Sequence, residues 1–72
     1  MNYRLESFSD RACQRMAERL SLSASSDARA MEQARAVAWR RECAGESRVL
    51  VLSRPSDGGW EEMARIGTRR YA

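Results

Sequence analysis

The chain has 72 residues, a formal net charge of +3, and thirteen basic residues, every one of them arginine. A chain of this length forms a single domain, residues 1–72. It buries only about 60% of the surface that its unfolded form exposes, which leaves little room for a catalytic pocket beside a core. No apolar run is long enough to cross a membrane, and residues 1–10 lack the apolar segment of a secretory signal. We therefore expect a cytoplasmic protein with no membrane partner.

The first two predicted elements are strands. Apolar and polar side chains alternate at the start of residues 3–8, which is typical of a half-buried strand. A second strand is predicted at residues 16–24, because residues 21–24 alternate cleanly between serine and apolar side chains and have poor helix propensity. Glu18 is the one charged residue on the apolar side of this second strand.

A helix over residues 10–20 is the alternative for the second element. The helical repeat would place Cys13, Met16 and Leu20 on one face, and Asp10 would serve as the N-cap. This alternative accounts for the apolar spacing before residue 20, but it leaves the alternation that follows unexplained. We expect the strand.

The next predicted element is a helix over residues 27–43. Ser26 is its expected N-cap, Asp27 suits the positive end of the helix dipole, and Gly45 is the expected C-terminal cap. The stripe that should face the core consists largely of small residues, which would let the helix lie close to a sheet. Its members are Ala30, Met31, Ala34, Val37, Ala38 and Arg41.

Two further strands and a short basic tail complete the predicted elements. The run Val49–Leu52 is apolar throughout, which indicates a strand buried on both faces and therefore central in its sheet. Residues 55–59 supply the proline and glycines of a hairpin loop, and residues 60–66 form the partner strand. We expect Trp60, at the start of that strand, to cover one end of the core. The tail spans residues 68–72.

The order strand, strand, helix, strand, strand predicts an α+β fold, with a small, mostly antiparallel sheet and one main helix packed on one face. The chain has no second layer for the opposite face, which should therefore stay open. We expect Arg15, Arg19 and Arg65 on this open face, joined by Arg4 or Arg54 according to the strand register.

The sequence lacks the residue patterns of common catalytic and metal sites. It has no histidine, so it can form neither an imidazole base nor a Ser-His-Asp triad, and it has no glycine-rich phosphate loop. The two cysteines, Cys13 and Cys43, are too few for a zinc site or a disulfide scaffold. We expect no enzyme activity, no metal, no cofactor, and no bond between the two cysteines.

The residues most suited to bind a partner are arginines and one tryptophan. Arginine makes bidentate contacts to phosphate and carboxylate, although a genome that favours arginine codons would also explain its abundance. Trp39 lies roughly 140° from the centre of the helix's inner stripe, at 100° per residue, so it is a candidate exposed anchor. The candidate binding residues are Arg15, Arg19, Arg54, Arg65 and Trp39.

The order of elements is similar to that of small anti-CRISPR proteins that phages direct against type I systems. The segments that carry this resemblance are Tyr3–Glu6, Ala24–Ser26, the alanine-rich helix, Gly45, Val49–Leu52 and the Trp60 strand. The resemblance implies a non-catalytic inhibitor in the bacterial host cell. It would bind the Cas proteins or the guide RNA of the surveillance complex (Cascade), as a monomer or weak dimer, and block target DNA binding. The alternative function is that of a small basic nucleic-acid-binding or accessory interaction protein.

Overall fold

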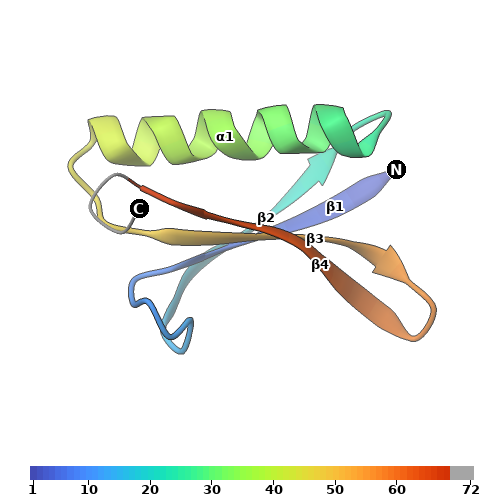
Figure 1. Ribbon diagram of the computed structural model, residues 1–72, viewed down its shortest axis with the longest axis horizontal. Helices are drawn as coiled ribbons and strands as arrows, with labels where there is room; N and C mark the ends of the chain where they lie inside the picture. Colours follow the sequence, from blue (N-terminus) through green and yellow to red (C-terminus); the bar gives the residue numbers. More distant parts are fainter. Residues whose placement is uncertain (69–72) are drawn as a thin grey trace.

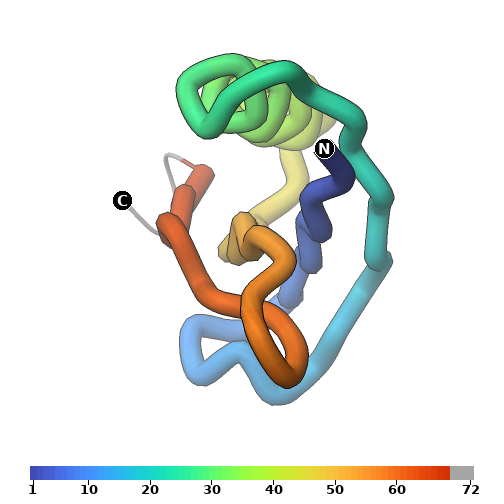
Figure 2. Tube along the Cα trace, turned by 90° about the vertical axis from the view of Figure 1, so that its right-hand side faces the viewer, coloured from blue at the N-terminus to red at the C-terminus, as the bar shows by residue number. Residues whose placement is uncertain are grey.

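The computed structural model describes residues 1–68 and has an α+β fold with the predicted order of elements. These are β1 (Asn2–Phe8), β2 (Met16–Ser23), α1 (Asp27–Cys43), β3 (Val49–Ser56) and β4 (Gly59–Gly67). The four strands form one antiparallel sheet in the order β2-β1-β3-β4. Helix α1 lies along one face of this sheet and leaves the opposite face uncovered, as Figure 1 shows from the side and Figure 2 from the end of the helix.

The prediction of a strand at residues 16–24 is confirmed, and the alternative helix over residues 10–20 is wrong. The carboxylate of Asp10 does accept backbone N–H groups, but these belong to Gln14 and Arg15 in a tight loop between β1 and β2. The Arg15 N–H, followed by that of Gln14, holds the pKa of Asp10 below its ordinary value of 3.8. Cys13 has a φ of 56° in the same loop, which no right-handed helix accommodates.

Helix α1 begins and ends where its capping residues predict. The Ser26 hydroxyl accepts the backbone N–H of Arg29 at 3.2 Å. At the other end Gly45 has a φ of 78°, and its N–H donates to the carbonyl of Glu42 at 2.9 Å. A positive φ of this size favours glycine, so the helix stops where glycine permits the chain to turn away.

The core lies between α1 and the two central strands. Tyr3 and Leu5 of β1, together with Leu50 and Leu52 of β3, are almost completely buried on the face that α1 covers. The helix meets them with four buried small or branched residues, and alanine lets a helix approach a sheet closely. These four residues are Ala30, Ala34, Val37 and Ala38. The prediction that Val49–Leu52 forms a central strand is confirmed.

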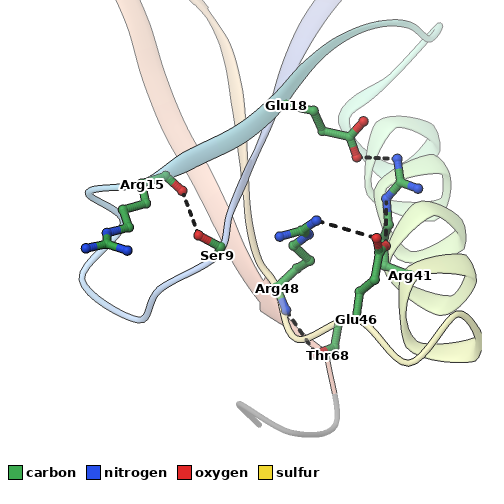
Figure 3. A network of polar contacts seen from close by, with 7 residues as sticks. All are labelled: Ser9, Arg15, Glu18, Arg41, Glu46, Arg48 and Thr68. Carbon is green, nitrogen blue, oxygen red and sulfur yellow. Dashed lines mark hydrogen bonds and ion pairs between the residues drawn. The ribbon is translucent and has the colours of Figure 1, made fainter.

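Two polar residues that interrupt apolar patterns in the sequence turn out to be partners. Glu18 lies on the helix-facing side of β2, and its carboxylate forms an ion pair with Arg41 of α1. Arg41 also pairs with Glu46, which in turn pairs with Arg48, as Figure 3 shows. The two distances are 3.8 Å and 3.5 Å. The backbone N–H of Arg48 in turn donates to the Thr68 hydroxyl. This network closes the end of the core at the C-terminus of α1.

No helix within residues 1–68 is long and apolar enough to span a membrane. Thr68 is buried, and its N–H donates to the carbonyl of Arg48 at 3.0 Å. The rest of the basic tail predicted at residues 68–72 lies outside the described residues.

Candidate interaction surface on the open sheet face

The candidate site is the sheet face opposite α1, which we call the open face. Strand register places its side chains in rows, because residues paired across an antiparallel sheet point to the same side. The three rows consist of Arg19, Glu6, Val51 and Arg65; then Ser21, Arg4, Ser53 and Glu62; then Met16, Phe8, Val49 and Gly67. The open face thus combines arginines and glutamates with an apolar row at one end.

Glu6 organises the charges of this face. One oxygen of its carboxylate lies 3.3 Å from a guanidinium nitrogen of Arg4, and the other accepts two hydrogen bonds from Arg19, at 2.9 and 3.3 Å. The Glu6 side chain is only 12% exposed, although no helix covers it. The long stems of the two arginines shield it, and its ion pairs in turn hold both guanidinium groups in place.

Trp60 also lies on the open face, so the expectation that it covers the end of the core is wrong. A register shift between Leu52 and Ser53 inserts one extra residue, Met63, into β4. Ala64 and Ile66 therefore face the helix, whereas the residues before the bulge turn to the other side. Trp60 pairs with Pro55 and remains 44% exposed, and the guanidinium carbon of Arg4 lies 4.7 Å from the centre of its ring.

Arg65 connects the open face to the loop between β1 and β2. Its guanidinium donates to Glu62 at 2.9 and 3.1 Å, and a third nitrogen approaches the Cys13 sulfur at 3.6 Å. The hydrogen bonds to Glu62 raise the pKa of Arg65 above its ordinary value, so this group stays fully charged. The loop that contains Cys13 therefore borders one end of the open face. Both cysteines are free thiols.

The structure brings together some of the predicted binding residues and separates others. Arg19 and Arg65 lie on the open face. The strand register places Arg4, and not Arg54, on the same face. Arg54 lies on the helix-facing side instead, where it bonds Asp27 at 2.8 Å and Glu61 at 2.9 Å.

Two other predicted residues also lie away from this face. Arg15 is exposed in the loop just before β2, where Figure 3 shows its backbone carbonyl accepting a bond from Ser9, so it belongs to no row of the sheet. Trp39 is 62% exposed on α1, at the other side of the molecule. The expectation that Arg15 lies on the open face is therefore wrong, because β2 begins only at Met16. Trp39 is exposed, as expected.

The sequence interpretation missed Glu6 and Trp60 as members of this surface. The alternation of Arg4 and Glu6 in the first strand was a usable signal, since it places both on one face. What could not be read from it is that Arg19 lies beside Glu6, because that contact depends on register.

In comparisons with known proteins, no family model, curated protein or solved structure matches this chain. Within residues 1–68, no three of the cysteine, aspartate and glutamate side chains gather in a way that could hold a metal ion.

The charges of the open face nearly cancel. The face carries three arginines, Arg4, Arg19 and Arg65, and the two glutamates Glu6 and Glu62. Each of these arginines forms an ion pair of 3.3 Å or less. Binding to a phosphate backbone gains its free energy from arginines and lysines whose charge is not already neutralised. A balanced and ion-paired surface with an exposed tryptophan matches the composition of protein–protein contacts better.

Proposed function

We propose that this protein is a non-catalytic binding protein and that its open face contacts a protein partner. The observation that carries the proposal is the stack of Arg4 on the exposed ring of Trp60, together with the ion pair between Arg4 and Glu6. Tryptophan and arginine are the residue types that most often dominate the free energy of protein–protein binding.

The arrangement of these side chains supports tight contact. A partner that binds free arginine and tryptophan side chains must first immobilise them, at about 0.5–1.5 kcal/mol for each. In this protein the ion pairs to Glu6 and the contact with Arg4 already restrict these side chains before a partner arrives. Less conformational entropy is then lost on binding.

The specific partner that we propose is the type I CRISPR–Cas surveillance complex of a bacterial host cell. The support for this choice is the similarity in element order to small phage anti-CRISPR proteins. On this proposal the open face occupies a protein surface of the complex as a stoichiometric inhibitor, in the cytoplasm, and target DNA can no longer bind.

The experiment measures how much target DNA a purified surveillance complex binds as this protein is added. The native protein should abolish DNA binding near a one-to-one ratio, and Trp60→Ala should weaken inhibition about tenfold or more while the domain stays folded. Arg35→Ala is the matched control, since Arg35 is an exposed residue on α1, away from the open face. It should inhibit like the native protein.

Each failure has a distinct meaning. Full DNA binding in the presence of the native protein would remove the surveillance complex as the partner. Native-like inhibition by folded Trp60→Ala would remove the open face as the contact surface. Direct binding of this protein to free DNA, weakening steeply between 50 and 200 mM salt, would instead favour the nucleic-acid-binding alternative.

A further inference from the structure

A second surface lies where α1 overhangs the outer edge of β2. A groove of about 340 Å³ opens there between the helix and the strand. Its lining is mostly apolar and consists of Leu22, Gln33, Ala36, Val37, Trp39 and Arg40. We call it the β2 groove. Trp39 forms one wall and remains 62% exposed, a large exposed fraction for the largest apolar side chain.

The backbone of β2 is free along this same edge. β2 is an outer strand of the sheet, and the Ala24 N–H donates inward to the carbonyl of Met1. Backbone groups alternate in direction along an antiparallel strand, so those of Arg19, Ser21 and Ser23 point away from β1. The side-chain amide of Gln33 donates to the outward carbonyl of Ser23 at 3.0 Å, which confirms the direction.

The free edge and the groove form one continuous surface. Within residues 1–68, the outward backbone groups of Arg19 and Ser21 have no hydrogen-bonding partner. The carbonyl of Ser23 is already bonded to Gln33, so the unpaired part of the β2 edge stops before Ser23. The only register shift of β2 lies near its start, opposite Ser7 and Phe8, so the edge beyond it is regular. An extended segment that pairs with this edge would direct every second side chain into the β2 groove.

Charge selects the chemistry of that segment. Arg40 is the one charged residue of the β2 groove, and within the described residues its guanidinium has no acidic partner. A segment with a carboxylate beside its apolar side chains would pair with it. A second copy of this chain fits less well, because each copy carries a net charge of +3 and two like-charged copies repel each other.

We propose that the β2 groove and the free edge of β2 bind an extended, acidic segment of a partner protein by strand addition. An apolar side chain of the segment contacts Trp39 and Leu22, a carboxylate pairs with Arg40, and the segment's backbone pairs with Arg19 and Ser21. This surface is separate from the open face, and the proposal stands whether or not the open face binds the partner proposed above.

The probe is a blocked seven-residue peptide in which Leu, Glu and Val alternate with Thr, so that one side carries two apolar groups and a carboxylate. The protein carries Trp60→Phe, which leaves Trp39 as its only tryptophan. Peptide at up to about 1 mM should shift the Trp39 emission to shorter wavelength and saturate. It should also protect the amides of Arg19 and Ser21 from hydrogen exchange.

Matched variants separate the parts of this proposal. Arg40→Glu should weaken peptide binding about tenfold or more, and Lys in place of Glu in the peptide should do the same. Arg35→Glu makes an identical charge change at an exposed residue of α1 that does not line the groove. Arg35 lies one helical turn before Trp39, so binding to this control is measured by protection of the Arg19 and Ser21 amides, which should be unchanged. N-methylation of one alternate set of peptide amides should abolish binding, and methylation of the other set should not, because only one edge of the peptide pairs with β2.

Three results would overturn the proposal. The first is an unchanged Trp39 emission at 1 mM peptide. The second is binding that leaves the Arg19 and Ser21 amides unprotected or that is equal for both methylated peptides. The third is protection of these two amides that rises with protein concentration in the absence of peptide, which would identify a second copy of the chain as the occupant.

Discussion

The two faces of the sheet are made from the same strands, yet they are shielded from water in different ways. On the covered face, Leu5, Leu52 and Ala34 of α1 belong to one core cluster and are fully buried. On the open face, Glu6 and Val51 are almost as well buried, but the side chains around them are arginines. A strand gives alternate residues to each face, so a small domain with one helix must close its second face with long polar side chains.

This difference predicts where the stability of the domain resides. Burying a large apolar side chain contributes about 1.5–3 kcal/mol, whereas an exposed ion pair contributes about 0–1 kcal/mol. The covered face should therefore carry most of the free energy of folding. Substitutions on the open face should change the free energy of folding little, except at the buried carboxylate of Glu6.

The largest effect should come from Ala34→Arg on the covered face. Ala34 is fully buried against the sheet, so arginine has no space there and would bring an unpaired charge into the core. We expect a loss of about 4 kcal/mol or more, comparable with the whole stability of a domain of this size, and therefore an unfolded protein by circular dichroism. Ala28→Arg, at an exposed position of the same helix, should melt like the native protein. A native-like melt of Ala34→Arg would contradict this account of the core.

A smaller effect should come from Arg19→Glu on the open face. From the sequence alone, charge reversal at Arg15 and Arg19 would be expected to leave the fold intact. The structure changes that expectation for Arg19, because a new carboxylate would face the shielded carboxylate of Glu6. We expect Arg19→Glu to lower the free energy of unfolding by about 1–2 kcal/mol in urea, and Arg15→Glu to change it by less than about 0.5 kcal/mol.

A second substitution makes this test specific. Glu6→Gln combined with Arg19→Glu removes the repulsion between carboxylates and should recover part of the lost stability. If Arg19→Glu and Arg15→Glu had the same urea midpoint as the native protein, Glu6 would not organise the charges of the open face.

The smallest effect should appear at alkaline pH. The Tyr3 hydroxyl donates a hydrogen bond to the carboxylate of Asp27 at 2.7 Å. Ionisation of Tyr3 would remove the donated proton, so this bond raises the pKa of Tyr3 above its ordinary value of 10.0. A group whose pKa is raised in the folded state contributes stability that is fully present below the unfolded pKa. Stability should therefore fall as the pH rises above 10.0 toward the higher folded pKa.

The control for this prediction is Tyr3→Phe, which has no hydroxyl to ionise. Its unfolding free energy should be lower at neutral pH, and its loss above pH 10 should be smaller than that of the native protein. Parallel pH profiles for the two proteins would mean that the bond between Tyr3 and Asp27 contributes nothing to this dependence.

The amino-acid sequence by itself determined the elements and their limits, because the signals that set them are local. Ser26 caps a helix through its own hydroxyl, Gly45 adopts a positive φ without steric cost, and residues 21–24 alternate whatever lies beside them. These properties belong to a few consecutive residues. The helix bounds at Asp27 and Cys43 therefore follow from the sequence without knowledge of the sheet.

The tertiary structure alone decided which side chains meet. Glu18 and Arg41 each looked misplaced in its own element, and only packing of α1 on β2 shows them to be a pair. The single extra residue in β4 moved Trp60 from the expected core to the open face. Strand register and bulges depend on contacts between distant segments, and a shift of one residue exchanges the two faces of a strand, so local patterns cannot determine them.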